Sequence, residues 1–538
     1  MGQIKSSNAG HSKSDRKLTG NVLVLGGGPA GTWAAISAVR EGASVILADK
    51  GFCGTSGATA PSGTGVWYVP PDPEARRQAR DSRDALGGYL ADHRWVHRVL
   101  DQTYSAVNEL GAWGYPFPKD PHGRPQRRSL QGPEYMRLMR KQVQRAGVQI
   151  LDHSPALELL ADAEGRVAGA AGINRQTGER WTVEAGAVVV ATGGCAFLSK
   201  ALGCNVLTGD GYLFAAEAGA DLSGMEFSNA YGLAPAFSSV TKGLFYNWAN
   251  FYYEDGTEIE GSGAHQGRSA IARTLLSQPV YARLDRATDD MRAWMRAAQP
   301  NFFLPFDRLG IDPFTQLFPV TLRLEGTVRG TGGIRIVDDQ CATTVPGLYA
   351  AGDAATREPI CGAFTGGGSH NAAWAISSGI WAGQGAARHA RRHPGKQLRL
   401  VHLGEAGLQP QAAGLSGLTA PEAVAAVQAE VFPFEKNLFR TGPVLSESLR
   451  KLDGLWKNIR RGLAPADPLR AREAAAMAAT ARWMYASALA RTESRGMHKR
   501  EDYPERDPRL HHRLISSGLD RVQVRPEAVE RAEEALAS

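Results

Sequence analysis

Three glycines and one aspartate near the start of the chain form a pattern with a definite chemical use. Gly26, Gly28 and Gly31 lie in the run GGGPAG, and Asp49 follows the next apolar segment. The first glycine permits a tight turn, the second lets the backbone approach a pyrophosphate, and the third lets a helix pack closely on a strand. Asp49 can accept a hydrogen bond from a ribose hydroxyl. The pattern therefore predicts a dinucleotide-binding site.

The elements needed to position these residues occur in the required order. An apolar run over 22–25 predicts a buried strand, residues 32–40 predict a helix that ends at Gly42, and residues 44–47 predict a second strand. The helix would point its free N-terminal amides at the pyrophosphate. Strand, turn, helix and terminal acid are all in register, which is a stronger signal than the glycines alone.

Two further glycine-rich stretches are expected to return to the same nucleotide. Residues 51–65, GFCGTSGATAPSGTG, are too rich in small and polar residues for a regular element, but they can wrap backbone amides around a ligand. An apolar strand over 187–191 ends in Thr192-Gly193-Gly194. Both stretches are typical of backbone that contacts a bound cofactor.

The pattern of glycine-rich turns continues through the second half of the chain. Thr208-Gly209-Asp210-Gly211 precedes a helix over 212–218, for which Asp210 is the expected N-cap. A strand over 347–351 ends at Gly352-Asp353, and Gly366-Gly367-Gly368 precede a helix over 371–392. These segments predict that the chain returns to the first domain after forming a separate, inserted domain.

The remaining segments predict additional domains. Helices are expected over 72–112 and 134–146, and a β-rich insertion over 148–183. Residues 239–316 are irregular and aromatic and are expected to form a separate lid. From about 414 onward the pattern is helical, and the chain ends in a charged, arginine-rich stretch. Its alternating signs predict a salt-bridged surface packed on the first domain, and the alternative is that Arg495, His498 and Arg500 bind substrate.

Composition indicates an ordinary globular protein. The chain has 538 residues, 43% of them hydrophobic and 21% charged, which suffices for two to four domains. No apolar stretch reaches the roughly 18 residues of a membrane span, and residues 1–18 lack the apolar core of a secretory signal. We therefore expect a cytoplasmic protein with no membrane span. The net charge of +7 is not concentrated in a basic block with interleaved aromatic residues, so no nucleic-acid partner is expected.

The five cysteines do not have metal-ligand spacing. Neither CxxC nor a Cys/His pattern occurs, so neither a zinc site nor an iron–sulfur cluster is expected in this chain, and no metal. Cys53 and Cys361 lie within glycine-rich segments. Each can be a redox-active thiol or a small buried side chain.

From about residue 20 to 510 the sequence resembles the flavoproteins of the succinate dehydrogenase and fumarate reductase family, which includes L-aspartate oxidase and adenylylsulfate reductase. The motifs that carry the resemblance are GGGPAG (26–31), ATGG (191–194), TGDG (208–211), MEF (225–227), GLYAAGD (347–353) and RTESRGMHKREDYPERD (491–507). The last motif is long and specific.

The resemblance implies an α/β fold in which a Rossmann-like FAD-binding domain is interrupted by an α+β capping domain and followed by a helical domain. The implied division is a disordered arm (1–18), the FAD-binding domain (19–236 and 330–395), the capping domain (237–329) and the helical domain (396–538). A single nucleotide fold also favours tightly held FAD over NAD.

The residues that the resemblance implies for FAD binding follow the glycine-rich segments. They are Gly26, Gly28, Pro29, Ala30, Gly31, Asp49, Lys50, Thr55, Ser56, Gly57, Ala58, Ser62, Gly63, Ala191, Thr192, Gly193, Asp210, Gly352, Asp353, Gly367, Gly368 and Asn371. Ser56 stands where relatives with covalent flavin have a histidine, so FAD is expected to bind non-covalently.

The family's substrate-binding residues are only partly retained. Its proton-transfer arginine, at the start of an RDVV-like stretch, matches Arg273. Two histidines and an arginine that bind a dicarboxylate fall on Tyr231, Val328 and Thr365. Each charge-assisted hydrogen bond to a carboxylate is worth about 1.5–3 kcal/mol, so their joint loss argues against succinate or fumarate as substrate.

Other residues can take part in the reaction. Arg323, Arg329, Arg335 and His370 are candidates to replace the missing groups from shifted positions. His370 can bind substrate, tune the flavin or cap the next helix. The candidate catalytic residues are Arg273, Tyr231 and His370, although Arg273 can also be an ordinary ion-paired residue.

Two functions of different kinds remain open at this stage. The first is an FAD-dependent oxidoreductase that transfers a hydride between flavin N5 and a small-molecule substrate. The second is a redox subunit that exchanges electrons with a separate iron–sulfur or ferredoxin-like protein. A non-catalytic FAD scaffold is disfavoured because it would need neither Arg273 nor an aromatic cap.

Overall fold

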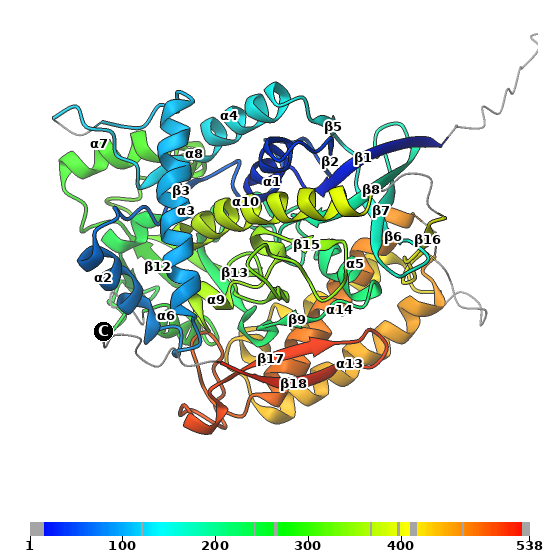
Figure 1. The fold of residues 1–538 in the computed structure, drawn as a ribbon. Coiled ribbons are helices and arrows are strands. Elements are labelled where there is room, and N and C mark those ends of the chain that lie inside the picture. Colours follow the sequence, from blue (N-terminus) through cyan, green and yellow to red (C-terminus); the bar gives the residue numbers. More distant parts are fainter. Residues whose placement is uncertain are drawn as a thin grey trace, which may run out of the picture.

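The computed structural model describes residues 15–119, 122–241, 243–262, 267–365, 368–394, 399–408, 417–464 and 467–529. Its centre is a mixed sheet with the order β16-β6-β7-β8-β1-β2-β5, and β15 pairs with one end of β8 (Figure 1). The strands of this sheet are β1 (Arg16–Leu25), β2 (Val45–Ala48), β5 (Gln149–Leu151), β6 (Ala156–Ala161), β7 (Val167–Ile173), β8 (Arg180–Val190), β15 (Leu348–Ala350) and β16 (Val401–His402).

The parallel part of the sheet positions the glycine turn. β1 lies between β2 and β8, with Val22 opposite Val45 on one side and Ala187 on the other. The run from Val22 to Leu25 is completely buried at the centre of the sheet, which explains why it is apolar without alternation. β1 begins at Arg16, so residues 16–18 belong to the sheet and not to the expected arm.

Helices from distant parts of the chain cover this sheet. α1 (Pro29–Arg40) packs on α10 (Gly368–Arg392), which also contacts α3 (His93–Ala112). The other helices of this region are α2 (Pro73–Asp84), α4 (Gly132–Arg145), α5 (Asp210–Glu217) and α9 (Glu358–Cys361). A two-stranded sheet of β3 (Gly63–Gly65) and β4 (Ser129–Gln131) lies nearby. The βαβ unit and the return of α10 to it agree with the sequence pattern.

The cap has its own antiparallel sheet, with the order β10-β13-β12-β11. Its elements are β10 (Ala230–Pro235), β11 (Asn250–Tyr252), β12 (Val280–Arg283), β13 (Phe318–Gly326), α6 (Gly267–Thr274), α7 (Asp289–Ala298) and α8 (Pro300–Leu309), with a 3₁₀ turn at Leu244–Trp248. Many of the aromatic residues pack together as the core of the cap, such as Phe245 and Phe302 at 5.3 Å. β10 lies before residue 237, so the cap sheet includes residues from before the expected boundary.

The C-terminal region combines helices with a hairpin. α11 (Ala420–Val431), α12 (Phe434–Asn437), α13 (Gly442–Arg461) and the largely buried α14 (Pro468–Ala490) form the helical part. The hairpin of β17 (His512–Ser517) and β18 (Gln523–Ala528) then joins β9 (Leu222–Ser223), which also pairs with β14 (Gly333–Ile334). Further short 3₁₀ turns in the described chain lie at Met225–Phe227, Gly352–Ala354 and Pro508–Leu510.

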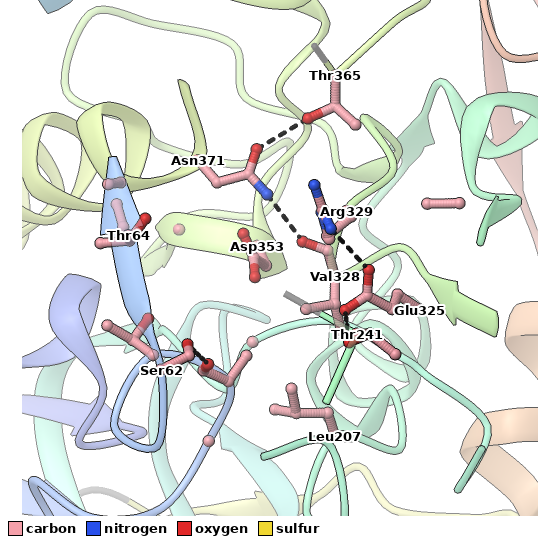
Figure 2. Close-up of a pocket in the computed structure, with 18 of the residues that line it drawn as sticks. Ser62, Thr64, Leu207, Thr241, Glu325, Val328, Arg329, Asp353, Thr365 and Asn371 are labelled. Carbon is pink, nitrogen blue, oxygen red and sulfur yellow. Dashed lines mark hydrogen bonds and ion pairs between the residues drawn. The ribbon is translucent and has the colours of Figure 1, made fainter. Parts of the chain in front are cut away.

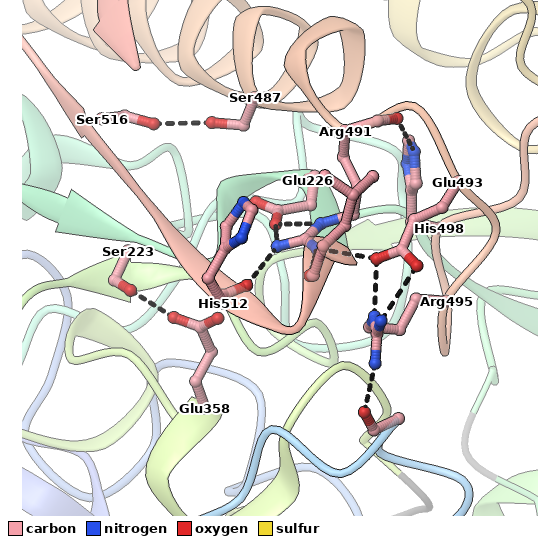
Figure 3. A network of polar contacts seen from close by, with 12 residues as sticks. Ser223, Glu226, Glu358, Ser487, Arg491, Glu493, Arg495, His498, His512 and Ser516 are labelled. Carbon is pink, nitrogen blue, oxygen red and sulfur yellow. Dashed lines mark hydrogen bonds and ion pairs between the residues drawn. The ribbon is translucent and has the colours of Figure 1, made fainter. Parts of the chain in front are cut away.

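The charged segment after α14 is salt-bridged and packs against Glu226 of the first domain, but its charges are buried where a surface was expected. Arg491 pairs with Glu226 at 2.8 Å and with Glu493 at 2.9 Å, and all three side chains are fully buried (Figure 3). Glu493 also binds Arg495, and the Nδ1 atom of His498 lies 2.7 Å from Arg440. The alternating charges therefore pair with partners from distant segments inside the molecule. No helix in the described ranges is long and apolar enough to span a membrane.

Candidate functional site

A cavity of about 1620 Å³ lies between the carboxyl ends of the parallel strands and the cap. Small-ligand sites usually measure about 300–1,000 Å³, so this one has room for an extended dinucleotide and a substrate together. It is lined by the β1–α1 turn, the 56–65 stretch, the turns at 191–193 and 352–353, the start of α10 and the inner side of the cap.

The three glycines of the first turn have different surroundings. A Cβ atom at Gly26 would lie 2.3 Å from the Ala191 carbonyl oxygen, and its φ is +108°. A Cβ atom at Gly31 would lie 1.8 Å from the carbonyl oxygen of Gly26. A Cβ atom at Gly28 meets nothing within 4 Å, and Gly28 is the N-cap of α1 without a side-chain cap. Gly26 and Gly31 thus serve the fold, whereas Gly28 faces open cavity at a helix N-terminus suited to a phosphate.

Asp49 is held by its own loop at the end of β2. Its carboxylate accepts hydrogen bonds from the amide nitrogens of Gly27 at 2.5 Å and Gly51 at 2.8 Å, and from the Ser56 hydroxyl at 2.6 Å. These donors fix the carboxylate at the cavity wall, in the position expected for a ribose contact. Ser56 also lines the cavity, with a hydroxyl where some relatives carry the covalent histidine.

Lys50 and Asp210 also line the cavity, but they are bound to each other. Lys50 Nζ lies 2.8 Å from Asp210 and 2.7 Å from Glu473 of α14. Burial opposes the charge of Lys50, but the two carboxylates outweigh it and raise the pKa of the ammonium group. The N-cap of α5 is Gly209, so the expectation that Asp210 caps this helix was wrong; its carboxylate bonds Lys50 and the Thr208 hydroxyl instead.

The second and third glycine turns complete the wall. The hydroxyl of Thr192 is buried at the cavity and has no hydrogen-bond partner within the described residues, which leaves it free for a bound molecule. Gly352 has φ of +65°, and a Cβ atom there would lie 2.7 Å from Ala30. Asp353 lines the cavity beside Gly352 and pairs with Arg357. The open glycine, the helix N-terminus and the free hydroxyl are the features that fit FAD.

Most of the expected FAD-binding residues line this cavity. They are Gly26, Gly28, Pro29, Ala30, Asp49, Lys50, Ser56, Gly57, Ala58, Ser62, Gly63, Ala191, Thr192, Gly193, Asp210, Gly352, Asp353 and Asn371. Two others lie elsewhere. Gly31 packs behind the turn, and Thr55 lines a separate pocket of about 440 Å³. Gly368 is the first residue of α10. Gly366 and Gly367 lie outside the described residues.

The fold and the cavity define an FAD-binding oxidoreductase. Residues 21–231 match the FAD binding domain family, and residues 435–534 match the fumarate reductase flavoprotein C-terminal family. The chain therefore combines a domain of the FAD binding family with a C-terminal domain of the fumarate reductase flavoprotein type.

Two curated relatives match nearly the whole chain. The L-aspartate oxidase of Streptomyces coelicolor is 27% identical over 91% of this chain and 90% of its own length. A fumarate reductase flavoprotein subunit of Mycobacterium tuberculosis is also 27% identical, over 95% of this chain and 97% of its own.

Two solved structures share the fold. A variant of FrdA from E. coli quinol fumarate reductase has a TM-score of 0.82 at 21% identity, over 97% of this chain and 99% of its own. Adenylylsulfate reductase from Archaeoglobus fulgidus has a TM-score of 0.76 at 18% identity, over 97% and 98%. These structures confirm the expected fold class, and the match to the FAD binding domain family confirms the flavin cofactor.

The three positions where the resemblance placed a carboxylate clamp now have defined surroundings. The Tyr231 hydroxyl donates to the backbone carbonyls of Val431 at 3.0 Å and Phe432 at 3.2 Å. Val328 is buried and apolar. The Thr365 hydroxyl donates to Asn371 Oδ1 at 2.8 Å, and Asn371 donates to the Val328 carbonyl at 3.1 Å. None of these three side chains offers a positive charge to a ligand.

An ion pair in the same wall is the main feature that we did not predict. Arg329 lies 3.1 Å from the buried carboxylate of Glu325, which also accepts a 2.8 Å hydrogen bond from Thr241 (Figure 2). All three residues line the cavity. The sequence indicates Arg329 only as one of several substitutes for the missing clamp, and its i,i+4 spacing from Glu325 is the signal that could have predicted the pair.

The structure places Arg273 and His370 outside the cavity wall. The Arg273 side chain is 61% exposed, lies 2.9 Å from Glu501 and stacks over Phe439. His370 is buried against Trp67, with ring centroids 4.2 Å apart. Burial, assisted by the charges of Arg83 and Arg357, lowers the pKa of His370 to about 3, so the ring is neutral. Neither side chain is among those that line the cavity.

Helix α6 nevertheless contributes to the cavity. Ser269 and Ile271 line it, whereas Arg273 does not. Arg268 is followed by Ser-Ala-Ile-Ala-Arg, so the RDVV-like stretch can also be aligned from residue 268.

The cysteine alternatives are decided by burial. Cys53 and Cys361 are both buried, and burial raises the pKa of each thiol to about 12. A thiol with such a pKa is protonated at neutral pH and is a poor nucleophile. Both residues are small buried side chains within glycine-rich turns.

Proposed function

We propose that this FAD-dependent oxidoreductase acts on a substrate other than a simple dicarboxylate. Bound FAD would supply hydride transfer at its N5 atom. Gly28, Asp49, Thr192 and Asp353 would hold the cofactor, and the cap would hold the substrate against it and exclude water. This function follows from the cavity residues and from the two domain families that the chain matches.

The observation that carries the proposal is the lack of charge at the three clamp positions. The Tyr231 hydroxyl is hydrogen-bonded to backbone carbonyls, Val328 is apolar, and the Thr365 hydroxyl is hydrogen-bonded to Asn371. The nearby Arg329 is neutralised by Glu325. Loss of three charge-assisted hydrogen bonds, each about 1.5–3 kcal/mol, would weaken a bound dicarboxylate by on the order of 10³-fold or more.

The cap supports a larger and less polar substrate. Phe245, Tyr246, Phe251 and Trp294 line the cavity on this side. The Tyr246 hydroxyl is buried and has no hydrogen-bond partner within the described residues. A substrate with an apolar body and one hydrogen-bonding group would satisfy this surface, because a buried hydroxyl left unpaired is costly.

The test uses the purified, FAD-loaded enzyme. Succinate oxidation is measured with an artificial dye as electron acceptor, and fumarate reduction with a reduced dye as donor. We expect negligible turnover in both directions at full flavin occupancy. Turnover at the rates usual for dicarboxylate enzymes would overturn the proposal.

We also place the proton-transfer role at Arg268 and not at Arg273. The support is the alternative alignment of the family stretch from residue 268. An arginine has a pKa above 12, so its use as an acid requires a desolvated position or a relay group. The exposed, ion-paired Arg273 lacks such a position.

The second candidate is a redox subunit that passes electrons to a separate iron–sulfur or ferredoxin-like protein. The favouring observation is that the mycobacterial relative is a fumarate reductase flavoprotein subunit. Mixing the dye-reduced, FAD-loaded enzyme with oxidised ferredoxin under anaerobic conditions tests it. Rapid flavin reoxidation would support this function, and reoxidation no faster than with buffer would refute it.

A further inference from the structure

Two arginines at one end of the cavity have no role in the function proposed above. Arg83 lies near the end of α2, and Arg128 directly precedes β4. Both line the cavity. Within the described part of the chain, neither guanidinium takes part in an ion pair or hydrogen bond, whereas the neighbouring Arg77 and Arg80 are both paired with acids.

The two arginines flank the first turn of α10. A Cβ atom at Gly65 would lie 3.6 Å from Ser369 and 3.8 Å from the carbonyl oxygen of Arg128, so Arg128 and Ser369 are near neighbours across β3. The charge of Arg83 acts on His370, the next residue of α10. The N-terminus of this long helix adds positive potential to that of the two guanidinium groups.

The acidic residues that line the cavity do not compensate these charges. Asp210 is paired with Lys50, Glu325 with Arg329, and Asp353 with Arg357. Asp49 accepts hydrogen bonds from two amides and from Ser56. Arg83 and Arg128 therefore leave a local excess of positive charge.

This end of the cavity is joined to the cap and is bordered by exposed apolar side chains. Gln131 of β4 makes the connection, because it donates a 3.2 Å hydrogen bond to the Ala298 carbonyl at the end of α7. Trp294, on the same helix, lines the cavity and is 51% exposed, and Leu86, beside α2, is 48% exposed. Exposed apolar residues at a cavity edge are typical of a ligand entrance.

We propose that Arg83 and Arg128 bind an anionic group of the substrate, so that the substrate class is an apolar molecule with a single carboxylate, sulfonate or phosphate. The apolar body would lie along Trp294 and Phe245. This inference rests on the proposed function, because none of the three clamp positions carries a cationic side chain. The anion therefore anchors the molecule at a distance from the reacting atoms.

The experiment compares two dyes of similar shape on the FAD-loaded enzyme. 8-Anilino-1-naphthalenesulfonate is an apolar monoanion, and N-phenyl-1-naphthylamine is its uncharged counterpart. Each is titrated by fluorescence and calorimetry against the parent, Arg83→Gln, Arg128→Gln and the double variant. Arg77→Gln, on the same helix but outside the cavity, is the matched control.

We expect the sulfonate to bind the parent at one site per chain. Each single glutamine variant should bind it about tenfold or more weakly, in line with loss of a charge-assisted hydrogen bond. The neutral dye and the Arg77→Gln control should be unaffected, and lysine at 83 and 128 should restore most of the affinity. Flavin absorbance per chain verifies that each variant is folded and loaded.

Equal sulfonate affinity in the parent and the double variant would overturn the proposal, and so would an equal loss for both dyes. The titration involves no turnover, so its failure leaves the proposed function standing. Succinate turnover by the parent enzyme would instead overturn the proposed function.

Discussion

Single residues of the first turn have separable roles. Gly26 and Gly31 make room for neighbouring backbone, whereas Gly28 leaves its side-chain space to the cavity. The φ of Gly28 is −77°, which any residue can adopt. A side chain at this position should therefore clash with the cofactor without disturbing the fold.

Gly28→Val is expected to give a folded apoprotein. The valine fits the empty cavity but occupies the space where the pyrophosphate would lie, whereas Gly31→Ala places its Cβ against the Gly26 carbonyl and should reduce the soluble yield. Flavin absorbance per chain and thermal unfolding measure the two effects. Normal flavin content in Gly28→Val would show that the nucleotide binds elsewhere.

FAD is expected to leave the denatured protein. Ser56 carries a hydroxyl where a covalent flavin needs a histidine, and this hydroxyl is bonded to Asp49. Acid or heat should release all of the flavin to the supernatant, with one FAD per folded chain. A yellow pellet after denaturation would contradict this prediction.

Arg329→Met should destabilise the protein by about 3–5 kcal/mol, because it leaves the Glu325 carboxylate buried without its partner. Arg329→Met combined with Glu325→Gln should cost less than the single change. Chemical denaturation of the FAD-loaded proteins measures both. Additive effects of the two substitutions would mean that the pair is not coupled.

At the scale of elements, the orientation of a short helix decides which of its side chains can act. α6 turns Ile271 to the cavity and Arg273 to solvent, although the two positions are close in sequence. The aromatic residues of the cap likewise divide between its core and the cavity wall. The position of each element therefore has to be known before chemistry is assigned to its residues.

Arg268→Ala and Arg273→Ala are expected to differ strongly. Loss of a group that moves a proton or stabilises charge should slow flavin reduction by about 10²–10⁴-fold, so Arg268→Ala should fall in this range. Arg273→Ala should change it little, because this side chain is exposed, ion-paired and not among those that line the cavity. The rate of flavin reduction is measured by stopped flow with a substrate that the parent enzyme oxidises. A larger loss of rate in Arg273→Ala than in Arg268→Ala would assign the role to Arg273.

At the scale of the whole molecule, buried charges join segments far apart in sequence. Arg491, after α14, pairs with Glu226 of the first half, as Figure 3 shows. Glu358 of α9 accepts a hydrogen bond from Ser223 of β9, which pairs with the C-terminal hairpin. Burial raises the pKa of Glu358 to about 7, with Glu226 acting in the same direction and Arg513 opposing it.

Glu358 is expected to make the stability of the fold depend on pH. A carboxyl group whose pKa rises from 4.5 to about 7 on folding binds its proton more tightly in the native state. Its contribution is complete below pH 4.5 and is lost as pH rises through 7. Glu358→Gln, which stays neutral, should therefore unfold at a higher temperature than the parent at pH 8.

The comparison of Glu358→Gln with the parent is made over pH 5–8 with FAD bound. The difference in melting temperature should increase with pH in favour of the variant, since other titrating groups are common to both proteins. An equal pH dependence of parent and variant would show that Glu358 does not titrate in this range.

The sequence by itself determined the nucleotide domain, because its features are local. The turn from Gly26 to Gly31, the flanking strands and Asp49 are fixed by contacts within one βαβ unit, and periodicity and glycine spacing report such contacts directly. The family motifs likewise predicted the cap and the helical domain.

Tertiary structure alone decided the partners of the isolated charged residues. Alternating charges over 491–500 suggested a surface, but packing against Glu226 and Arg440 buries and pairs them. The same applies to Arg273, whose exposure depends on how α6 lies on the cap, and to Arg83 and Arg128, which meet at the cavity from separate elements. A side chain's charge is set by its type, whereas its burial and partners are set by segments that can be hundreds of residues away.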